Sequence, residues 1–385
     1  MKIGIAKERR ANELRVAVSP DTVKKLVGLG ADVAIEAGAG LASACTDEAY
    51  QAAGARIVPD ARAAIGDADV VLKVQRPLAA TEGGPDEMAL LKPGSMLIGI
   101  LAPFAAKDQV AAYARQGVNA FAMEFMPRIT RAQTMDVLSS QSNLAGYRAV
   151  IDAASEFGRA FPMMMTAAGT VAPARVLVMG AGVAGLQAIA TARRLGAIVS
   201  ATDVRPAAKE QVTSLGGTFV AVEDEEFKQA ETAAGYAKPM SAEYQKKQAA
   251  LIAETIKKQD VVITTALIPG RPAPVLVTED MVKAMKPGSV IVDLAVEQGG
   301  NCPLSEAGTV VVKHGVKIVG HLNVPSRTAV DSSSLYARNL LNFLTPLIDK
   351  ESKALKINWD DEIIRGTALT RDGKVVHPTL VEGAA

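Results

Sequence analysis

The sequence predicts an α/β protein made of two Rossmann-like domains with parallel sheets, separated by a cleft and joined by long helices. Short runs rich in valine and isoleucine alternate with alanine-, lysine- and glutamate-rich stretches along the chain, which is the pattern of βαβ units. The 385 residues exceed what one ordinary hydrophobic core accommodates. A glycine-rich turn in the middle of the chain follows one such valine-rich run and precedes a helical stretch.

The first third of the chain is predicted to form one sheet with helices between its strands. Ser19 and Pro20 have the residue types of an N-cap and a first helical position, so a helix is expected over 19–29. A long helix is expected over 141–161, where apolar residues recur at helical spacing, and it would link the two domains. The expected strands are 3–6, 32–36, 69–74, 95–100 and 118–123.

The middle of the chain is predicted to form a second sheet. A helix over 332–344 then suggests that the chain returns to the first domain, giving domains of 1–137 plus 327–385 and of 138–326. The segment 223–240 is expected to be a loop that acts as a flexible lid, and Met163 to Met165 are expected in the core. Six strands, the number in a full dinucleotide-binding sheet, are expected at 175–179, 198–202, 218–222, 260–264, 289–293 and 316–320.

The composition excludes several classes of function. The formal net charge is +1 and both signs are interspersed, so we expect no nucleic-acid partner. Two distant cysteines, Cys45 and Cys302, predict neither a disulfide framework nor a zinc site, and they fit a reducing compartment, the cytosol. The histidines have no metal-ligand spacing, so no metal is expected. No signal peptide or membrane-spanning stretch is expected either.

The glycine-rich turn has the context of a dinucleotide-binding fingerprint. Gly180 would permit the tight turn, Gly182 would let the backbone approach a pyrophosphate, and Gly185 would let the following helix pack close to the strand. Asp203, 21 residues after Gly182, would accept hydrogen bonds from the adenosine ribose and repel a 2′-phosphate. NAD(H) is therefore expected in the second domain rather than NADP(H), although Arg205 nearby could favour a phosphate.

Motifs along essentially the whole chain resemble the soluble NAD(H)-binding component of proton-translocating NAD(P) transhydrogenases, whose superfamily includes alanine dehydrogenase. Three segments favour the transhydrogenases: 127–143, the loop around Tyr236, and the run from Tyr147 to Val178. Motifs shared by the superfamily lie at 7–8, 15–20, 73–77, 264–270 and 273–276.

This resemblance implies a set of site residues. Those beside the transferred hydride would be Arg128, Gln133, Asp136, Ser139 and Tyr236. Two structural alternatives stay open: Arg128 and Asp136 could form a surface ion pair, and Tyr236 could pack under its own loop. The nucleotide-binding residues implied are Arg128, Ile129, Gln133, Gly180, Ala181, Gly182, Val183, Gly185, Asp203, Val204, Arg205, Gly235, Gln248 and Leu267.

Groups that an amino-acid dehydrogenase needs are missing from the sequence. Such an enzyme moves a proton as well as a hydride and therefore needs an acid or base near its substrate. The histidine of the alanine dehydrogenases is absent from 99–103, and Glu297 stands where they have aspartate. Arg15 and Lys73 resemble their carboxylate-binding residues, or are structural groups paired with Glu8 or another acid.

Hydride transfer between two nicotinamides needs alignment and the exclusion of water but no general base. The resemblance therefore implies an Si/Re-specific, proton-translocating oxidoreductase in which this chain binds NAD(H), while a partner domain binds NADP(H) and membrane subunits conduct protons. It also implies a homodimer that is cytoplasmic and peripheral to the inner membrane. The alternatives are an amino-acid dehydrogenase of the alanine dehydrogenase type and an NAD-sensing regulatory module.

Overall fold

The structure is a computed structural model, which describes residues 1–229, 240–268 and 270–381. The chain divides into two compact units: unit 1 is Met1–Gln141 with Pro325–Ala385, and unit 2 is Ser142–Val324. The helix α5 (Val137–Glu156) runs from unit 1 into unit 2, so it begins and ends earlier than the helix predicted over 141–161. Each unit is an α/β fold around a largely parallel sheet, and the predicted fold class is confirmed.

Unit 1 is built on a six-stranded sheet in the order β3-β2-β1-β4-β5-β6, and all of its pairings are parallel. Its strands are β1 (Lys2–Ile5), β2 (Asp32–Glu36), β3 (Arg56–Val58), β4 (Val70–Gln75), β5 (Met96–Ile100) and β6 (Asn119–Ala122), with a small hairpin of β16 (Thr370–Arg371) and β17 (Lys374–Val375). Its helices are α1 (Pro20–Gly28), α2 (Asp47–Ala52), α3 (Ala61–Ile65), α4 (Lys107–Arg115), α11 (Ala329–Leu344), α12 (Glu362–Thr367) and α13 (Pro378–Val381).

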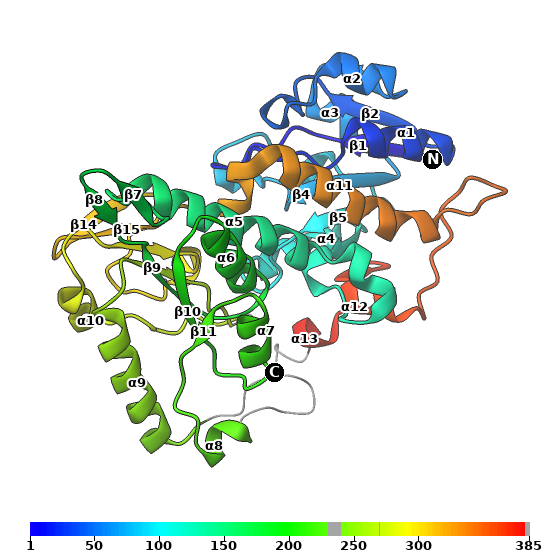
Figure 1. Cartoon of the computed structure of the whole chain (residues 1–385). Helices are drawn as coiled ribbons and strands as arrows, with labels where there is room; N and C mark the ends of the chain where they lie inside the picture. The colour runs from blue at the N-terminus through cyan, green and yellow to red at the C-terminus, as the bar shows by residue number, and fades with distance from the viewer. Residues whose placement is uncertain (230–239, 269, 382–385) are drawn as a thin grey trace. The chain divides into compact units, whose positions relative to one another are not determined.

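Both faces of this sheet are buried because alternate residues of each strand enter different cores. Along β4, Val70 and Leu72 belong to the core that α1 and α11 cover, whereas Val71 belongs to the core on the other face. Figure 1 shows α11, in orange, lying against the blue N-terminal elements although it comes from the end of the chain. As predicted, Ser19 caps α1, with its side chain accepting from the Thr22 backbone N–H.

Unit 2 is built on a seven-stranded sheet in the order β11-β10-β9-β12-β13-β15-β14. The strands of unit 2 are β7 (Met164–Thr166), β8 (Gly169–Val171), β9 (Arg175–Met179), β10 (Ile198–Thr202), β11 (Thr218–Phe219), β12 (Val261–Thr264), β13 (Val290–Asp293), β14 (Val310–Lys313) and β15 (Val316–Val319). Its helices are α6 (Val183–Arg194), α7 (Ala208–Ser214), α8 (Glu225–Lys228), α9 (Ala242–Ile256) and α10 (Glu279–Ala284).

The six predicted strands of unit 2 are all present, but three expectations were wrong. The edge strand β14, which pairs antiparallel with β15, is a seventh strand that the sequence analysis missed. The segment 223–240 is not wholly a loop because it contains α8. Met163, Met164 and Met165 are 59%, 43% and 79% exposed rather than in the core, since Met164 and Met165 belong to the hairpin β7–β8.

Candidate functional site

The glycine-rich turn follows β9 at the carboxyl edge of the unit 2 sheet. It lies where the strand order reverses between β9 and β12, the position at which open α/β sheets bind ligands. Gly180 has φ +104°, a conformation that side chains rarely adopt. A Cβ atom on Gly185 would lie 1.8 Å from the carbonyl oxygen of Gly180, whereas one on Gly182 would meet nothing within 4 Å. Gly180 and Gly185 thus shape the turn, and Gly182 faces open space.

The helix α6 begins directly at this turn. Its N-cap is Gly182, and no side chain among the described residues caps it. The amide N–H groups of its first turn therefore point to where a ligand could accept their hydrogen bonds, with the positive end of the helix dipole behind them. This end of α6 has the geometry of an anion-binding site.

Asp203 follows β10 at the same edge and is held in a network of hydrogen bonds. One carboxylate oxygen accepts from the Ala181 N–H at 2.7 Å, which ties Asp203 to the glycine-rich turn. The guanidinium of Arg205 donates to both carboxylate oxygens, at 2.9 and 3.0 Å. Because this pair neutralises the arginine, Arg205 is not free to attract a 2′-phosphate while Asp203 is ionised.

The other predicted nucleotide-binding residues of unit 2 are of two kinds. Val183, Val204 and Leu267 are apolar yet 40%, 60% and 47% exposed, so a ligand that covers them would bury apolar surface. Ala181 is buried, and Gln248 on α9 holds polar groups of the neighbouring backbone and of β10. The Gln248 side chain accepts from the Val222 N–H at 2.8 Å and donates to the Thr202 hydroxyl at 3.2 Å.

The predicted hydride-site loop lies in unit 1, at the start of α5. Arg128 and Gln133 are exposed, and Ile129 and Ser139 are half-buried. Asp136 accepts from the Ser139 N–H at 3.0 Å and so caps the beginning of the helix. Among the ion pairs of the described residues there is none between Arg128 and Asp136, which contradicts the alternative that they form a surface pair. Arg131, instead, pairs with Asp361 at 2.8 Å.

Two predicted residues, Gly235 and Tyr236, lie outside the described residues. Of the rest, the structure gathers Gly180 to Gly185, Asp203 and Arg205 at one edge of the unit 2 sheet. The segment from Arg128 to Ser139 forms a separate group in unit 1.

The corresponding edge of the unit 1 sheet is filled by buried charges. The guanidinium of Arg15 binds the Glu13 carboxylate at 2.7 and 2.8 Å and donates to the Gln141 side chain at 2.8 Å. Although burial opposes ionisation, these bonds and the charge of Arg15 lower the pKa of Glu13 to about 2. Arg15 thus has its carboxylate inside the protein.

Lys73 on β4 is neutralised in the same way. Its ammonium lies 3.0 Å from a carboxylate oxygen of Glu87 and 3.3 Å from one of Glu8, and all three side chains are at least 97% buried. Burial raises the pKa of Glu8, against the effect of Lys73. The alternative that Arg15 and Lys73 are structural groups paired with acids is therefore confirmed for both side chains.

The sequence analysis missed two polar residues of the unit 2 edge. Thr265, just after β12, donates its hydroxyl to the Gly180 carbonyl oxygen at 3.1 Å. Asn301 is fully buried and binds the backbone of Ala266. The only signal in the sequence was that Thr265 lies in a motif shared with the superfamily.

The described residues contain no cluster of histidine, cysteine or acidic side chains arranged to hold a metal ion. Within that portion of the chain there is also no helix with the length and hydropathy needed to span a bilayer.

The fold and the open edge of unit 2 define a two-domain dinucleotide-binding protein of the Rossmann type. The chain belongs to the alanine dehydrogenase/PNT family, whose N-terminal domain matches residues 4–145 and whose C-terminal domain matches residues 149–378. These matches confirm the resemblance found in the sequence.

Relatives within the family differ in how similar they are. The chain is 64% identical over 380 residues to an NAD(P) transhydrogenase subunit alpha protein of Rhodospirillum rubrum, and the match covers 99% of each chain. A solved structure of a transhydrogenase from Sinorhizobium meliloti is 57% identical with a TM-score of 0.88, over 98% of this chain and 100% of that one. The alanine dehydrogenase of Bacillus subtilis is 32% identical, over 99% of this chain and 94% of that protein.

Proposed function

We propose that this chain is the NAD(H)-binding component of a proton-translocating NAD(P) transhydrogenase, in which hydride passes between NADH here and NADP⁺ on a partner domain. The observation that supports this most is an edge of unit 2 open to a dinucleotide, in a chain 64% identical to a transhydrogenase subunit alpha protein. The two compact units would correspond to the predicted domains, 1–137 plus 327–385 and 138–326.

The residues present fit NAD(H). A side chain at Gly182 would project into open space, so glycine there leaves room for a ligand against the backbone. The uncapped start of α6 would hold the pyrophosphate, Asp203 would accept from the adenosine ribose, and Val204 and Leu267 would cover apolar parts of the nucleotide.

The nicotinamide ring supplies the hydride when the nucleotide is bound, so the protein has to orient the ring and exclude water. We assign this task to Arg128, Gln133, Asp136 and Ser139, and to Tyr236. Asp136 fixes the loop by capping α5, whereas the exposed Arg128 and Gln133 are available to bind a ligand. No proton donor or acceptor is required of this set.

The alanine dehydrogenase alternative is disfavoured by the ion pairs of unit 1. A 2-oxo acid needs a free cation for its carboxylate, but Arg15 is paired with Glu13, and Lys73 with Glu8 and Glu87. Displacing a buried carboxylate from such a pair is costly. We therefore expect no amination of pyruvate.

The partners would be an NADP(H)-binding domain and membrane subunits that conduct protons, with this chain peripheral to the inner membrane on the cytoplasmic side. Relatives named as subunit alpha support a multi-subunit assembly. The hydride transfer would be Si/Re-specific.

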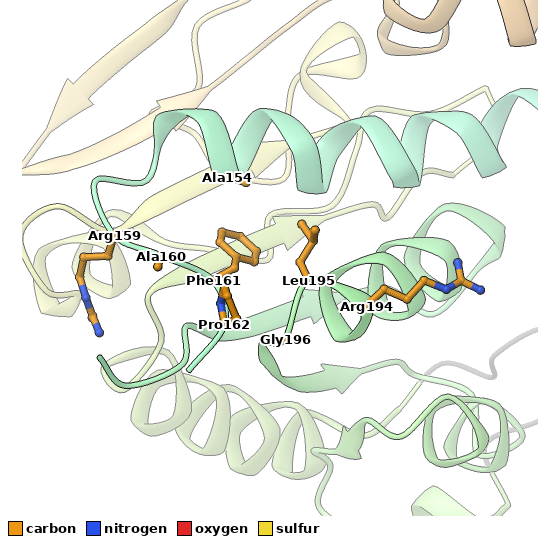
Figure 2. Close-up of a pocket in the computed structure, with 8 residues that line it drawn as sticks. All are labelled: Ala154, Arg159, Ala160, Phe161, Pro162, Arg194, Leu195 and Gly196. Carbon is orange, nitrogen blue, oxygen red and sulfur yellow. The ribbon is translucent and has the colours of Figure 1, made fainter. Parts of the chain in front are cut away.

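We also propose that the chain is a homodimer that buries the hairpin β7–β8. A two-stranded hairpin is marginally stable by itself, and this one exposes Met164 and Met165. Beside it lies a hollow of about 500 Å³ where Phe161 and Leu195 face each other (Figure 2). A second copy is the occupant that would cover both. Sedimentation should give a dimer for the wild type and a monomer for Met165→Asp, whereas Leu41→Asp, an equally exposed change in unit 1, should stay dimeric.

Binding and turnover assays test the proposed function directly. The purified chain should bind NADH more tightly than NADPH in calorimetry and should not oxidise NADH with pyruvate and ammonium. Substantial pyruvate amination would contradict the proposal in favour of an amino-acid dehydrogenase. Binding without hydride transfer, even with an NADP(H)-binding partner added, would favour an NAD-sensing module.

A further inference from the structure

The buried side chain of Asn301 joins the loops that follow β12 and β13 in unit 2. Its amide nitrogen donates to the carbonyl oxygens of Ala266 at 2.9 Å and Pro274 at 2.8 Å. Its amide oxygen accepts from the Ala266 N–H at 3.1 Å. One side chain thus binds both backbone groups of Ala266, in the way that a neighbouring strand would.

Asn301 is itself fixed by Asp293, the last residue of β13. One carboxylate oxygen of Asp293 accepts from the Asn301 N–H at 3.2 Å, the Ala295 N–H at 3.0 Å and the Thr264 hydroxyl at 3.1 Å. Both Asp293 and Asn301 are at least 99% buried. The position of the Asn301 side chain is therefore set by the sheet itself.

The segment that Asn301 binds lies at the open edge. It follows β12 without regular secondary structure, so its backbone groups need partners from elsewhere. On one side of Ala266, the Thr265 hydroxyl donates to the carbonyl oxygen of Gly180 at 3.1 Å. On the other side, Leu267 is 47% exposed and is one of the residues assigned to the nucleotide.

We propose that Asn301 is a positioning residue for NAD(H) binding, which holds the 265–267 segment against the glycine-rich turn so that the dinucleotide meets a preformed site. The proposal rests on the function proposed above. Without the Asn301 amide, the backbone groups of Ala266 have no protein partner in this network and the segment can leave the turn. Asn301 touches neither the glycine-rich turn nor Leu267 through any of these bonds, so its effect is indirect.

The test is the affinity for NADH of Asn301→Leu, a substitution of similar size without polar atoms. We expect its Kd for NADH, measured by calorimetry, to rise roughly tenfold. With an NADP(H)-binding partner, KM for NADH should rise in parallel while the hydride-transfer rate at saturating NADH stays at the wild-type value. If Asn301→Leu does not fold, Asn301→Asp serves, because it keeps the acceptor for Ala266 and loses both donors.

The matched control is Ser305→Ala. Its hydroxyl donates to the other carboxylate oxygen of Asp293 at 2.7 Å and makes no bond to the 265–267 segment. This variant should unfold at a lower temperature and bind NADH like the wild type. Wild-type affinity in a folded Asn301 variant, or an equal loss in Ser305→Ala, would overturn the proposal. A wild-type chain that does not bind NADH would instead overturn the proposed function.

Discussion

The two units contain the same kind of parallel sheet but differ at the point where the strand order reverses. In unit 1, between β1 and β4, buried acids occupy the edge and neutralise Lys73 and, nearby, Arg15. In unit 2, between β9 and β12, the edge has bare glycines and an uncapped helix. One edge supplies its own counter-charges, and the other leaves backbone donors for a ligand.

This difference separates stability from binding within a single chain. Breaking an ion pair of unit 1 leaves an uncompensated buried charge, so it should cost folding free energy and spare the nucleotide. Altering the open edge of unit 2 should change nucleotide binding and, at some positions, leave the fold intact. The following substitutions test that separation.

The largest effect is expected from Glu13→Gln, which removes the carboxylate that neutralises Arg15. The free energy of unfolding should fall by about 3–5 kcal/mol, measured by denaturant unfolding, while the Kd for NADH stays unchanged. Asp32→Asn is the control, since Asp32 pairs with Arg56 on the surface, and it should cost less than about 1 kcal/mol. Equal costs for the two variants, or a loss of NADH affinity in Glu13→Gln, would show that the unit 1 cluster does not have the separate role given to it.

The next effect contrasts two alanine substitutions in the glycine-rich turn. Gly185→Ala places a methyl group against the Gly180 carbonyl, so it should lower stability by roughly 1–3 kcal/mol and displace α6. Gly182→Ala meets nothing in the protein, so it should leave the unfolding temperature unchanged and still weaken NADH binding, because its methyl group enters the ligand's space. Normal NADH affinity in Gly182→Ala would refute the assignment of that open space to the dinucleotide.

A smaller effect concerns the choice between NAD(H) and NADP(H). In Asp203→Asn the Arg205 guanidinium loses its counter-charge and becomes available to a 2′-phosphate. We expect the Kd for NADH to rise roughly tenfold and the Kd for NADPH to fall. The gain for NADPH should disappear in the double variant Asp203→Asn/Arg205→Ala. If it persists there, Arg205 is not the group that binds the phosphate.

The smallest effect is a pH dependence in unit 1. Glu124 accepts from the backbone N–H groups of Leu101 and Ala102, but burial raises its pKa to about 7. The folded state therefore binds a proton that the unfolded state releases at lower pH, so its contribution to stability is present below about pH 4.5 and is lost as the pH rises through 7. Glu124→Gln should remove this decline when unfolding is followed at pH 5 and pH 8. An unchanged decline would assign it to another group.

Local patterns made much of the fold and the open edge predictable. The strands of both sheets follow from apolar runs, and Gly180, Gly182, Gly185 and Asp203 lie within one short stretch whose spacing reflects a single turn. These features depend on neighbouring residues, so the sequence contains the needed information.

Other features depend on contacts between distant residues. Asn301 is 35 positions from Ala266, and Arg15 is 126 positions from Gln141, so neither contact leaves a local pattern. Three consecutive methionines look the same in a core and on an exposed hairpin, which is why Met163 to Met165 were misplaced. The positive φ of Gly180 was foreseeable, whereas the partner of Lys73 was one of several acids.

The central claim is that the open edge of unit 2 serves hydride transfer to a second nucleotide rather than to a small substrate. The most direct measurement mixes the purified chain with the NADP(H)-binding component of a transhydrogenase and follows reduction of an NADP⁺ analogue by NADH. The account predicts hydride transfer only when both proteins are present, at a rate reduced in Gln133→Ala. Absence of transfer in the mixture, together with reduction of pyruvate in the presence of ammonium by the chain alone, would contradict it.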